Sequence, residues 1–247
     1  VVFLNDLIFP DIPVKEFKKC KDDVSVVFIS DIHVGSNLFA EKEFERFIQW
    51  INCEWGTEEQ RLLAKKVKYL VVSGDLIDGV GIYPGQEDEL HIKDIYEQYE
   101  KLAYYFDSIR KDVKIVCIGG NHDALRLAEP QPPLSQDFAK SLYKISNITH
   151  VSNPSIVRLH DKFDVLMYHG SSFDYYMNNV DFIRNAGGYD ASETMMEFCL
   201  KKRHIAPTHI SSLSIPDINE DPLVIKTVPD FFVTGHIHYD VKFHNYK

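Results

Sequence analysis

Residues able to bind metal ions recur in five short motifs along the chain. In order, the motifs are Asp31-Ile32-His33, Gly74-Asp75, Gly120-Asn121-His122-Asp123, Tyr168-His169-Gly170 and Gly235-His236-Ile237-His238. Each motif alone is a weak signal, since such short combinations arise by chance in many chains. Five of them in this order, each soon after an apolar run, are hard to obtain by accident. Together they predict a two-metal site that hydrolyses phosphate esters.

The types of ligand indicate which metals the site would hold. Carboxylate, imidazole and amide oxygen without thiolate suit Mn²⁺ or Fe²⁺, with Zn²⁺ as an alternative, whereas Mg²⁺ rarely recruits so many histidines. A carboxylate shared by two ions would let them lie roughly 3.5–4 Å apart and share a water molecule. The ions would activate that water for in-line attack on phosphorus and neutralise charge on the phosphoryl oxygens. We therefore expect two divalent ions, with Mn²⁺ as the first choice.

Each motif must be held by a neighbouring element, and the apolar runs indicate strands. They are short, rich in β-branched and aromatic residues, and closed by Ser, Gly or His, which is typical of buried strands that end in loops. The runs cover residues 26–29, 69–72, 115–118, 165–167 and 231–233. Five loops that bear ligands could then meet at one rim of a sheet.

Between the strands, apolar residues recur at helical spacing. The stripes predict one helix near residues 44–51 and a longer one near 90–110, while the Met195, Met196, Phe198 and Cys199 cluster is typical of a helix facing the core. After residue 147 the pattern shifts to short strands at 148–151, 155–160 and 163–168. Strand-helix alternation followed by strand-rich sequence predicts an α/β fold with two mixed sheets packed face to face and helices outside.

Composition narrows the class of protein. The 247 residues, 45% of them apolar, allow one large domain with a sizeable core. The formal charge, 27 minus 37 or −10, argues against a basic face that grips nucleic acid unaided. Four scattered cysteines without C-x-x-C spacing indicate neither a thiolate zinc site nor a disulfide framework, and no apolar run approaches the roughly 18 residues of a membrane span. We expect a cytoplasmic protein without membrane association.

Both ends of the chain look cut. The sequence begins without Met, and the prolines of Phe9-Pro10-Asp11-Ile12-Pro13 forbid regular helix and sheet. We expect residues 1–23 to be a connector from a preceding domain and residues 24–247 to form the catalytic domain, with further sequence beyond the C-terminus.

The five motifs resemble those of the calcineurin-like metallophosphoesterases, which include nucleases of double-strand-break repair, diesterases and Ser/Thr protein phosphatases. The resemblance spans residues 31–238 and implies an αββα sandwich. It also implies that Asp31, His33 and His238 hold the first metal, that Asn121, His169 and His236 hold the second, and that Asp75 bridges them. By the same resemblance, His122 would assist the leaving oxygen, and Asp123 would orient His122.

A narrower resemblance comes from residues 74–87, together with residues 9–13 and the Asp-Ile-His-Val-Gly-Ser run at 31–36. These segments are similar to the small subunits of the archaeal D-family DNA polymerases. That resemblance implies a 3′→5′ proofreading exonuclease that follows an oligonucleotide-binding barrel and docks on a large polymerising subunit. DNA with single-stranded or mismatched 3′ ends would be the substrate. Related eukaryotic B-subunits have lost their metal ligands, whereas every ligand is present here.

Several alternatives remain open at this stage. The five motifs alone would equally permit a phosphomonoesterase or protein phosphatase, and a structural polymerase subunit with a vestigial site is a third interpretation. Asp78 is either a carboxylate beside the metal ligands or a turn residue, and residues 79–91 form either a solvated loop or a flap over the site. We expect surface or structural roles for the histidines outside the motifs, namely His91, His150, His160, His204, His209 and His244.

Overall fold

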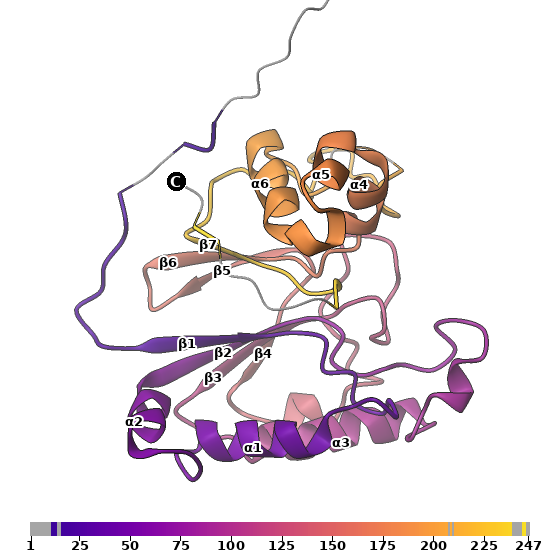
Figure 1. Ribbon diagram of the computed structural model, residues 1–247. Helices are drawn as coiled ribbons and strands as arrows, with labels where there is room; N and C mark the ends of the chain where they lie inside the picture. Colours follow the sequence, from indigo (N-terminus) through magenta and orange to yellow (C-terminus); the bar gives the residue numbers. More distant parts are fainter. Residues whose placement is uncertain (1–10, 14–15, 207, 209, 239–243, 246–247) are drawn as a thin grey trace, which may run out of the picture.

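Two β-sheets lie face to face with helices on both outer sides (Figure 1). The computed structural model describes residues 11–13, 16–206, 208, 210–238 and 244–245. Every strand predicted from an apolar run is present within these residues, and the helices come from the predicted stretches and from two stretches without a prediction, 58–66 and 173–185. The predicted arrangement of two sheets flanked by helices is therefore confirmed.

The first sheet has the strand order β1-β2-β3-β4 and all its pairs are parallel. The prediction of two mixed sheets is wrong for this one. Neighbouring parallel strands need crossover connections, and helices on the outer face supply the first two of them. The elements of this first layer are β1 (Ser25–Ile29), α1 (Glu41–Ile51), α2 (Glu58–Lys66), β2 (Val67–Ser73), α3 (Ile95–Asp107), β3 (Lys114–Ile118) and β4 (Ile148–His150), with short 3₁₀ turns η1 (Gln86–Asp88) and η2 (Leu142–Lys144).

The second sheet has the order β5-β6-β7 and is mixed as predicted, because β5 pairs antiparallel with β6 and β6 pairs parallel with β7. Helices α4, α5 and α6 cover its outer face (Figure 1). The helices at 173–185 were not predicted. The elements of this second layer are β5 (Ser155–Leu159), β6 (Phe163–Met167), α4 (Phe173–Asn179), α5 (Asp181–Asn185), η3 (Gly188–Ala191), α6 (Ser192–Lys202) and β7 (Phe231–Val233).

Side chains that point alternately to the two faces of each sheet divide the core into three apolar layers. In β2, Leu70 and Val72 pack with α1 and α3, whereas Val71 faces the other sheet. Val165 and Met167 of β6 meet it there. The third layer lies between the second sheet and its helices and contains the predicted core residues of α6, Met195, Phe198 and Cys199. Both sheets are therefore buried on two faces, which explains why their strands read as nearly continuous apolar runs.

Local signals set where the first-layer helices begin. Thr57 and Gln60 form a reciprocal capping box at the start of α2, and the Asp94 side chain accepts hydrogen bonds from the backbone of Tyr96 and Glu97 at the start of α3. The helix α3 ends at Asp107, and Ile109 of the predicted stripe packs into the same core from the following turn.

The predicted connector lies partly outside the described residues, since residues 1–10 and 14–15 are not among them. Its described part runs along the second layer into β1 (Figure 1). Lys18 Nζ lies 3.1 Å from Asp164 Oδ2 and 2.5 Å from Asp230 Oδ2. No helix of the described chain has both the length and the apolar character to cross a membrane.

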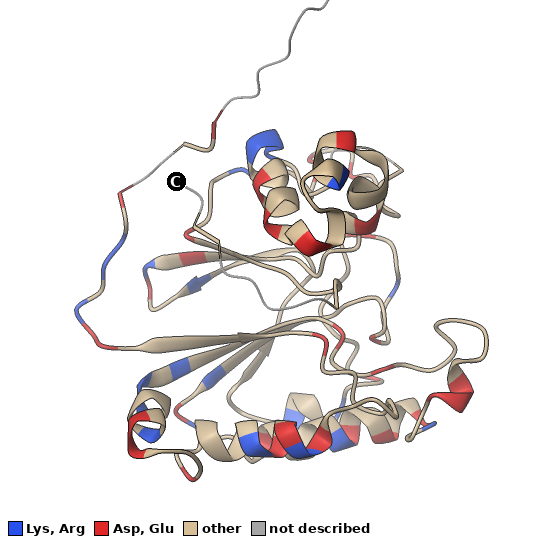
Figure 2. Cartoon of the chain, in the orientation of Figure 1, with Lys and Arg blue, Asp and Glu red and all other residues tan. Residues whose placement is uncertain are grey.

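Charged residues of both signs share the outer surface. Figure 2 shows Lys and Arg interspersed with Asp and Glu along the first-layer helices. Several basic side chains there contact a carboxylate directly, as in Lys101 with Glu41 at 2.7 Å and Arg46 with Glu43 at 3.9 Å. Charge on these helices is therefore largely compensated locally and does not form a cationic track for nucleic acid.

Candidate metal centre

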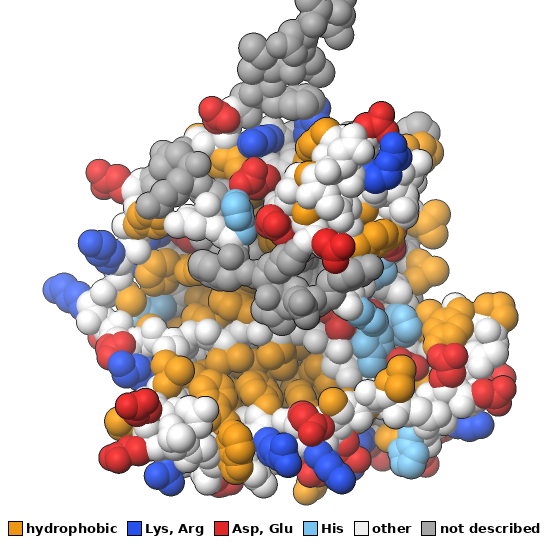
Figure 3. Space-filling view, in the orientation of Figure 1, with side chains coloured by type: hydrophobic (Ala, Val, Ile, Leu, Met, Phe, Trp, Pro, Cys, Tyr) orange, Lys and Arg blue, Asp and Glu red, His pale blue; other side chains and the backbone are white. Residues whose placement is uncertain are grey.

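The predicted ligands lie in the loops that directly follow strands. Since β1, β2 and β3 are parallel, their carboxyl ends open at one edge of the sheet, and β6 and β7 open at the matching edge of the second sheet. Seven predicted ligands converge there: Asp31, His33, Asp75, Asn121, His169, His236 and His238. Figure 3 shows histidine side chains gathered between the two layers at this edge.

Four of the predicted ligands have a left-handed backbone conformation. The φ angles are 52° for Asp31, 51° for His33, 48° for Asp75 and 71° for His236. A positive φ is unfavourable for residues other than glycine, and such strain concentrates at functional sites, where the surrounding structure enforces it. The sharp reversals aim successive side chains of one loop toward a common point.

Two glycines of the motifs are required by close approach. A Cβ on Gly120 would lie 2.2 Å from Asp75 Oδ1, and one on Gly235 would lie 2.6 Å from Asp31 Oδ2. Any side chain at either position would collide with a carboxylate. These glycines let the loops of different strands pack around the two aspartates.

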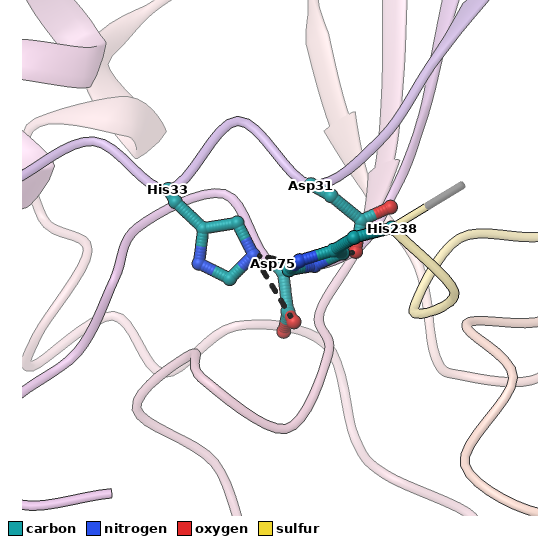
Figure 4. A group of neighbouring side chains, drawn as sticks. All are labelled: Asp31, His33, Asp75 and His238. Atoms are coloured by element: carbon teal, nitrogen blue, oxygen red, sulfur yellow. Dashed lines mark hydrogen bonds and ion pairs between the residues drawn. The ribbon is translucent and has the colours of Figure 1, made fainter. Parts of the chain in front are cut away.

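The first group of ligands contains Asp31, His33, Asp75 and His238, and each offers an atom within 4.8 Å of the others (Figure 4). His33 Nε2 lies 3.1 Å from His238 Nε2 and 3.7 Å from Asp75 Oδ2, and His238 Nε2 lies 3.4 Å from Asp31 Oδ1. Ligands about 2.1 Å from one ion are about 3 Å apart at right angles. The spacing therefore suits a single cation among them.

The second group contains Asp75, His169 and His236, whose ligand atoms again lie within 4.8 Å of one another. His169 Nε2 is 3.2 Å from Asp75 Oδ2 and 3.0 Å from Asn121 Oδ1, so the amide of Asn121 joins this group. Asp75 belongs to both groups. It has the position of a bridging carboxylate, as the resemblance implied.

Hydrogen bonds at the opposite ring nitrogens set the histidine tautomers. His33 Nδ1 lies 3.0 Å from Asp78 Oδ1, His169 Nδ1 lies 2.9 Å from the Ser73 carbonyl, and His236 Nε2 lies 2.9 Å from Asp174 Oδ2. Each oxygen accepts a hydrogen bond from the ring N–H beside it, so the other nitrogen of each ring is the one that can offer a lone pair to a cation. This is the arrangement that metal-binding histidines adopt. The donor set therefore fits two divalent cations.

The buried charges favour a cation between them. Burial opposes ionisation of Asp75, but the neighbouring histidines, His169 above all, hold the pKa of this carboxyl well below its usual range. Burial likewise disfavours a charged His169, yet the charge of Asp75 and its hydrogen bond raise the pKa of His169 to about 9. A proton on His169 thus balances the carboxylate, and a divalent ion would replace that proton.

His122 and Asp123 share a loop but face different surroundings. His122 is next to the first group, and its Nδ1 lies 2.7 Å from the backbone oxygen of Asp78. Asp123 is buried and accepts hydrogen bonds from the backbone of Leu76 and Gly120 and from the Tyr99 hydroxyl. The Asp123 carboxylate is therefore occupied by loop backbone and the Tyr99 hydroxyl in this structure, and the orientation of His122 by Asp123 stays a prediction.

The pKa of Asp123 reflects its surroundings. Burial, together with the nearby charge of Asp75, raises the pKa of Asp123 to about 7. This carboxyl stabilises the turns that carry Asp75 and Asn121.

Sequence reasoning left Asp78 open and missed two further residues that hold the ligands. Asp78 is buried against His33, so a carboxylate beside the metal ligands is favoured over a simple turn residue. Asp174 of α4 binds the His236 ring, and the Asn153 side chain accepts a hydrogen bond from the backbone N–H of His169. Asp174 lies in the first turn of α4, shortly after His169. Nothing in the sequence distinguishes it from other surface acids.

Histidines outside the motifs take structural or surface positions where the structure describes them. His160 pairs with Asp22, His204 with Asp221 and His244 with Glu197. His150 lies against Cys117, His91 is exposed, and His209 is outside the described residues.

The chain matches known proteins over nearly its whole length. A family model that describes the B subunits of DNA polymerases alpha and epsilon matches residues 26–242. The DNA polymerase II small subunit of Methanothermobacter thermautotrophicus is 49% identical over 237 residues, and the one of Archaeoglobus fulgidus is 43% identical over 237 residues. The corresponding subunit of Methanocaldococcus jannaschii is 40% identical over 237 residues.

The alignments cover this chain more completely than they cover its relatives. Each alignment covers 96% of this chain, but only 48%, 47% and 39% of the respective relatives. The chain therefore spans about half the length, or less, of the curated relatives that it matches.

Proposed function

The chain belongs to the family of the B subunits of DNA polymerases alpha and epsilon, and from this premise we propose that it is the phosphodiesterase domain of an archaeal DNA polymerase small subunit. In this proposal the two sheets form a calcineurin-like sandwich, and the domain acts as a two-metal 3′→5′ exonuclease that proofreads for the polymerase. Residues 1–23 would connect it to an oligonucleotide-binding domain.

The observation that carries the proposal is the double use of Asp75. One buried carboxylate contacts both groups of ligands, with His33 Nε2 of the first group at 3.7 Å and His169 Nε2 of the second at 3.2 Å. Two divalent ions held there, with Mn²⁺ expected ahead of Fe²⁺ or Zn²⁺, would activate water and neutralise charge on the phosphoryl group. A vestigial site has no reason to retain such an arrangement.

The chain's own residues would carry the remaining steps. The Nδ1–H of His122 donates to the Asp78 carbonyl at 2.7 Å, which leaves Nε2 as the ring atom that would exchange a proton. His122 would protonate the oxygen that leaves phosphorus. Asp78 also holds His33, so a single residue positions both a ligand and the proton donor.

The proposed partners are DNA and the large polymerising subunit. The net charge of −10 and the local pairing of surface charges give this domain little electrostatic attraction for phosphates. We expect the large subunit and the preceding domain to supply that attraction. Adding them should raise DNA affinity and its salt dependence more than it raises turnover of a small phosphodiester.

The direct test is hydrolysis by the purified chain after chelation and re-addition of metal. Single-stranded DNA labelled at its 5′ end should shorten stepwise from the 3′ end. The activity restored by Mn²⁺ should be at least roughly tenfold higher than that restored by Mg²⁺, because the ligand set is rich in imidazole. A chromogenic phosphomonoester serves as the comparison substrate. Faster hydrolysis of the monoester would identify a phosphatase, and no hydrolysis of either by the complete heterodimer would leave a structural subunit.

A further inference from the structure

The loop from Gly79 to Leu90 projects beside the metal centre and is anchored by two buried amides. Gln86 Nε2 donates to the backbone oxygen of Asp78 at 2.8 Å and to its Oδ2 at 3.1 Å, and Gln86 Oε1 accepts from the Ile82 N–H at 2.9 Å. Gln98 of α3 binds both the N–H and the carbonyl of Gly79. Both glutamine side chains are fully buried, so the loop is tied to the same Asp78 that holds His33.

The tip of this loop exposes apolar side chains next to the catalytic histidine. Val80, Ile82 and Tyr83 are 37%, 38% and 40% exposed. The Tyr83 ring lies 6.4 Å from the His122 ring between centroids, and the Tyr83 hydroxyl donates to Glu89 Oε2 at 2.6 Å. Figure 3 shows hydrophobic side chains on the projecting loop directly beside the histidines.

Charge excludes a role for this loop in attracting phosphates. Its other exposed side chains near the tip include Glu87, Asp88 and Glu89, which would repel the backbone of a nucleic acid. What the loop does offer is a flat aromatic face fixed in orientation by its hydroxyl. Bases stack on such faces with little regard to sequence, and alanine substitution of one such aromatic typically costs roughly 1–3 kcal/mol per base.

We propose that Tyr83 is a stacking platform for the nucleobase adjoining the scissile phosphate, with Val80 and Ile82 as its apolar margin. The inference rests on the proposed function and narrows its substrate class to nucleic acid with an unpaired end. A base held against Tyr83 would place its own phosphodiester within reach of His122. A paired base is already stacked in a duplex, so the platform would favour single-stranded or frayed ends.

The test measures stacking without cleavage. A single-stranded oligonucleotide with phosphorothioate linkages carries the fluorescent base 2-aminopurine at either of its last two positions, and it is titrated with the Mn²⁺-loaded chain. Wild type should quench the probe at one of these positions. Tyr83→Ala should bind roughly 5- to 150-fold more weakly and lose the quenching, whereas Tyr83→Phe should retain it because the ring remains. Tyr104→Ala, which removes a 69% exposed tyrosine on α3, is the matched control and should behave as wild type.

The possible outcomes separate this inference from the proposed function. Quenching and DNA hydrolysis that are equal in wild type and Tyr83→Ala would overturn the platform and leave the exonuclease intact. A complete heterodimer that neither binds this oligonucleotide nor hydrolyses the same sequence without phosphorothioate linkages would overturn both. Tyr83→Ala could also weaken the binding of a phosphopeptide and of an abasic oligonucleotide as much as it weakens the binding of the probe. That result would show that Tyr83 recognises no base.

Discussion

The two layers of the molecule contribute different chemistry to one site. Among the predicted ligands, the first layer, the parallel sheet with α1 to α3, supplies both carboxylates, the amide of Asn121 and one imidazole, that of His33. The second layer, the mixed sheet with α4 to α6, supplies imidazoles only, at His169, His236 and His238. Asp75 of the first layer contacts His169 of the second at 3.2 Å.

This difference indicates what each layer contributes to metal binding and to proton transfer. Negative charge is concentrated on one layer and its balancing groups on the other, so the site is complete only when the sheets are packed together. The first layer also carries His122 and Asp78, so proton transfer depends on it alone. We therefore expect substitution of Asp75 or His122 in the first layer to affect both metals or the chemistry, and substitution of a second-layer ligand to affect one metal.

The largest effect should follow Asp75→Asn. Replacing the shared carboxylate removes a charged ligand from both groups, so metal content measured by elemental analysis should fall for both ions and activity should disappear. The second-layer variant His236→Gln is the matched comparison, since it alters one group and should leave about one ion per chain. If Asp75→Asn still bound both ions, the bridging role and the proposed asymmetry would be wrong.

His122→Ala should retain both ions but lose roughly 10²–10⁴-fold in kcat, the usual scale for one general acid. The deficit should shrink on a nitrophenyl phosphodiester, whose leaving group needs little protonation. Single-turnover rates on DNA and on the nitrophenyl ester give the comparison. An equal loss on both substrates would indicate that His122 only positions other groups.

Asp174→Asn tests the support behind a second-layer ligand. This carboxylate holds the His236 ring, and such supporting contacts are typically worth 10- to 100-fold in metal affinity, so one ion should bind roughly that much more weakly. A calorimetric titration with metal would resolve the binding of the two ions. Weakening of both ions to the same degree would mean that the two layers do not act separately.

The smallest effect concerns stability at the edge of the first layer. Burial lowers the pKa of His150 to about 4, and its Nε2 is buried without a hydrogen-bond partner among the described residues. The unfolded chain therefore binds a proton between about pH 6.5 and 4 that the folded chain resists, so stability from this group is present above pH 6.5 and is lost as the pH falls toward 4.

Urea denaturation measures that loss. From pH 7 to pH 5, wild type should lose about 1–2 kcal/mol more stability than His150→Phe. The difference between the two proteins cancels the contribution of other titrating groups. The same pH dependence in both proteins would assign the loss to residues elsewhere.

Much of the fold could be predicted from local patterns. Runs of β-branched and aromatic residues identified β1, β2, β3, β6 and β7, since strands buried on both faces leave no polar alternation to confuse the interpretation. The parallel first sheet was missed because pairing direction depends on how the crossovers pack. Helix α2 and the short helices α4 and α5 were missed as well, because stretches of nine, seven and five residues are too short for a helical period to stand out.

The order and types of the five motifs were enough to predict which side chains converge, because carboxylates and imidazoles just after strands have few other reasons to recur. Tertiary structure alone decided how those ligands are supported. Asp78 and Asp174 reach their histidines from separate turns and helices, and Asp123 points into loop backbone although it follows His122 directly. Sequence neighbours share a loop, but the direction of each side chain depends on the strained turn that holds it and on which layer it meets.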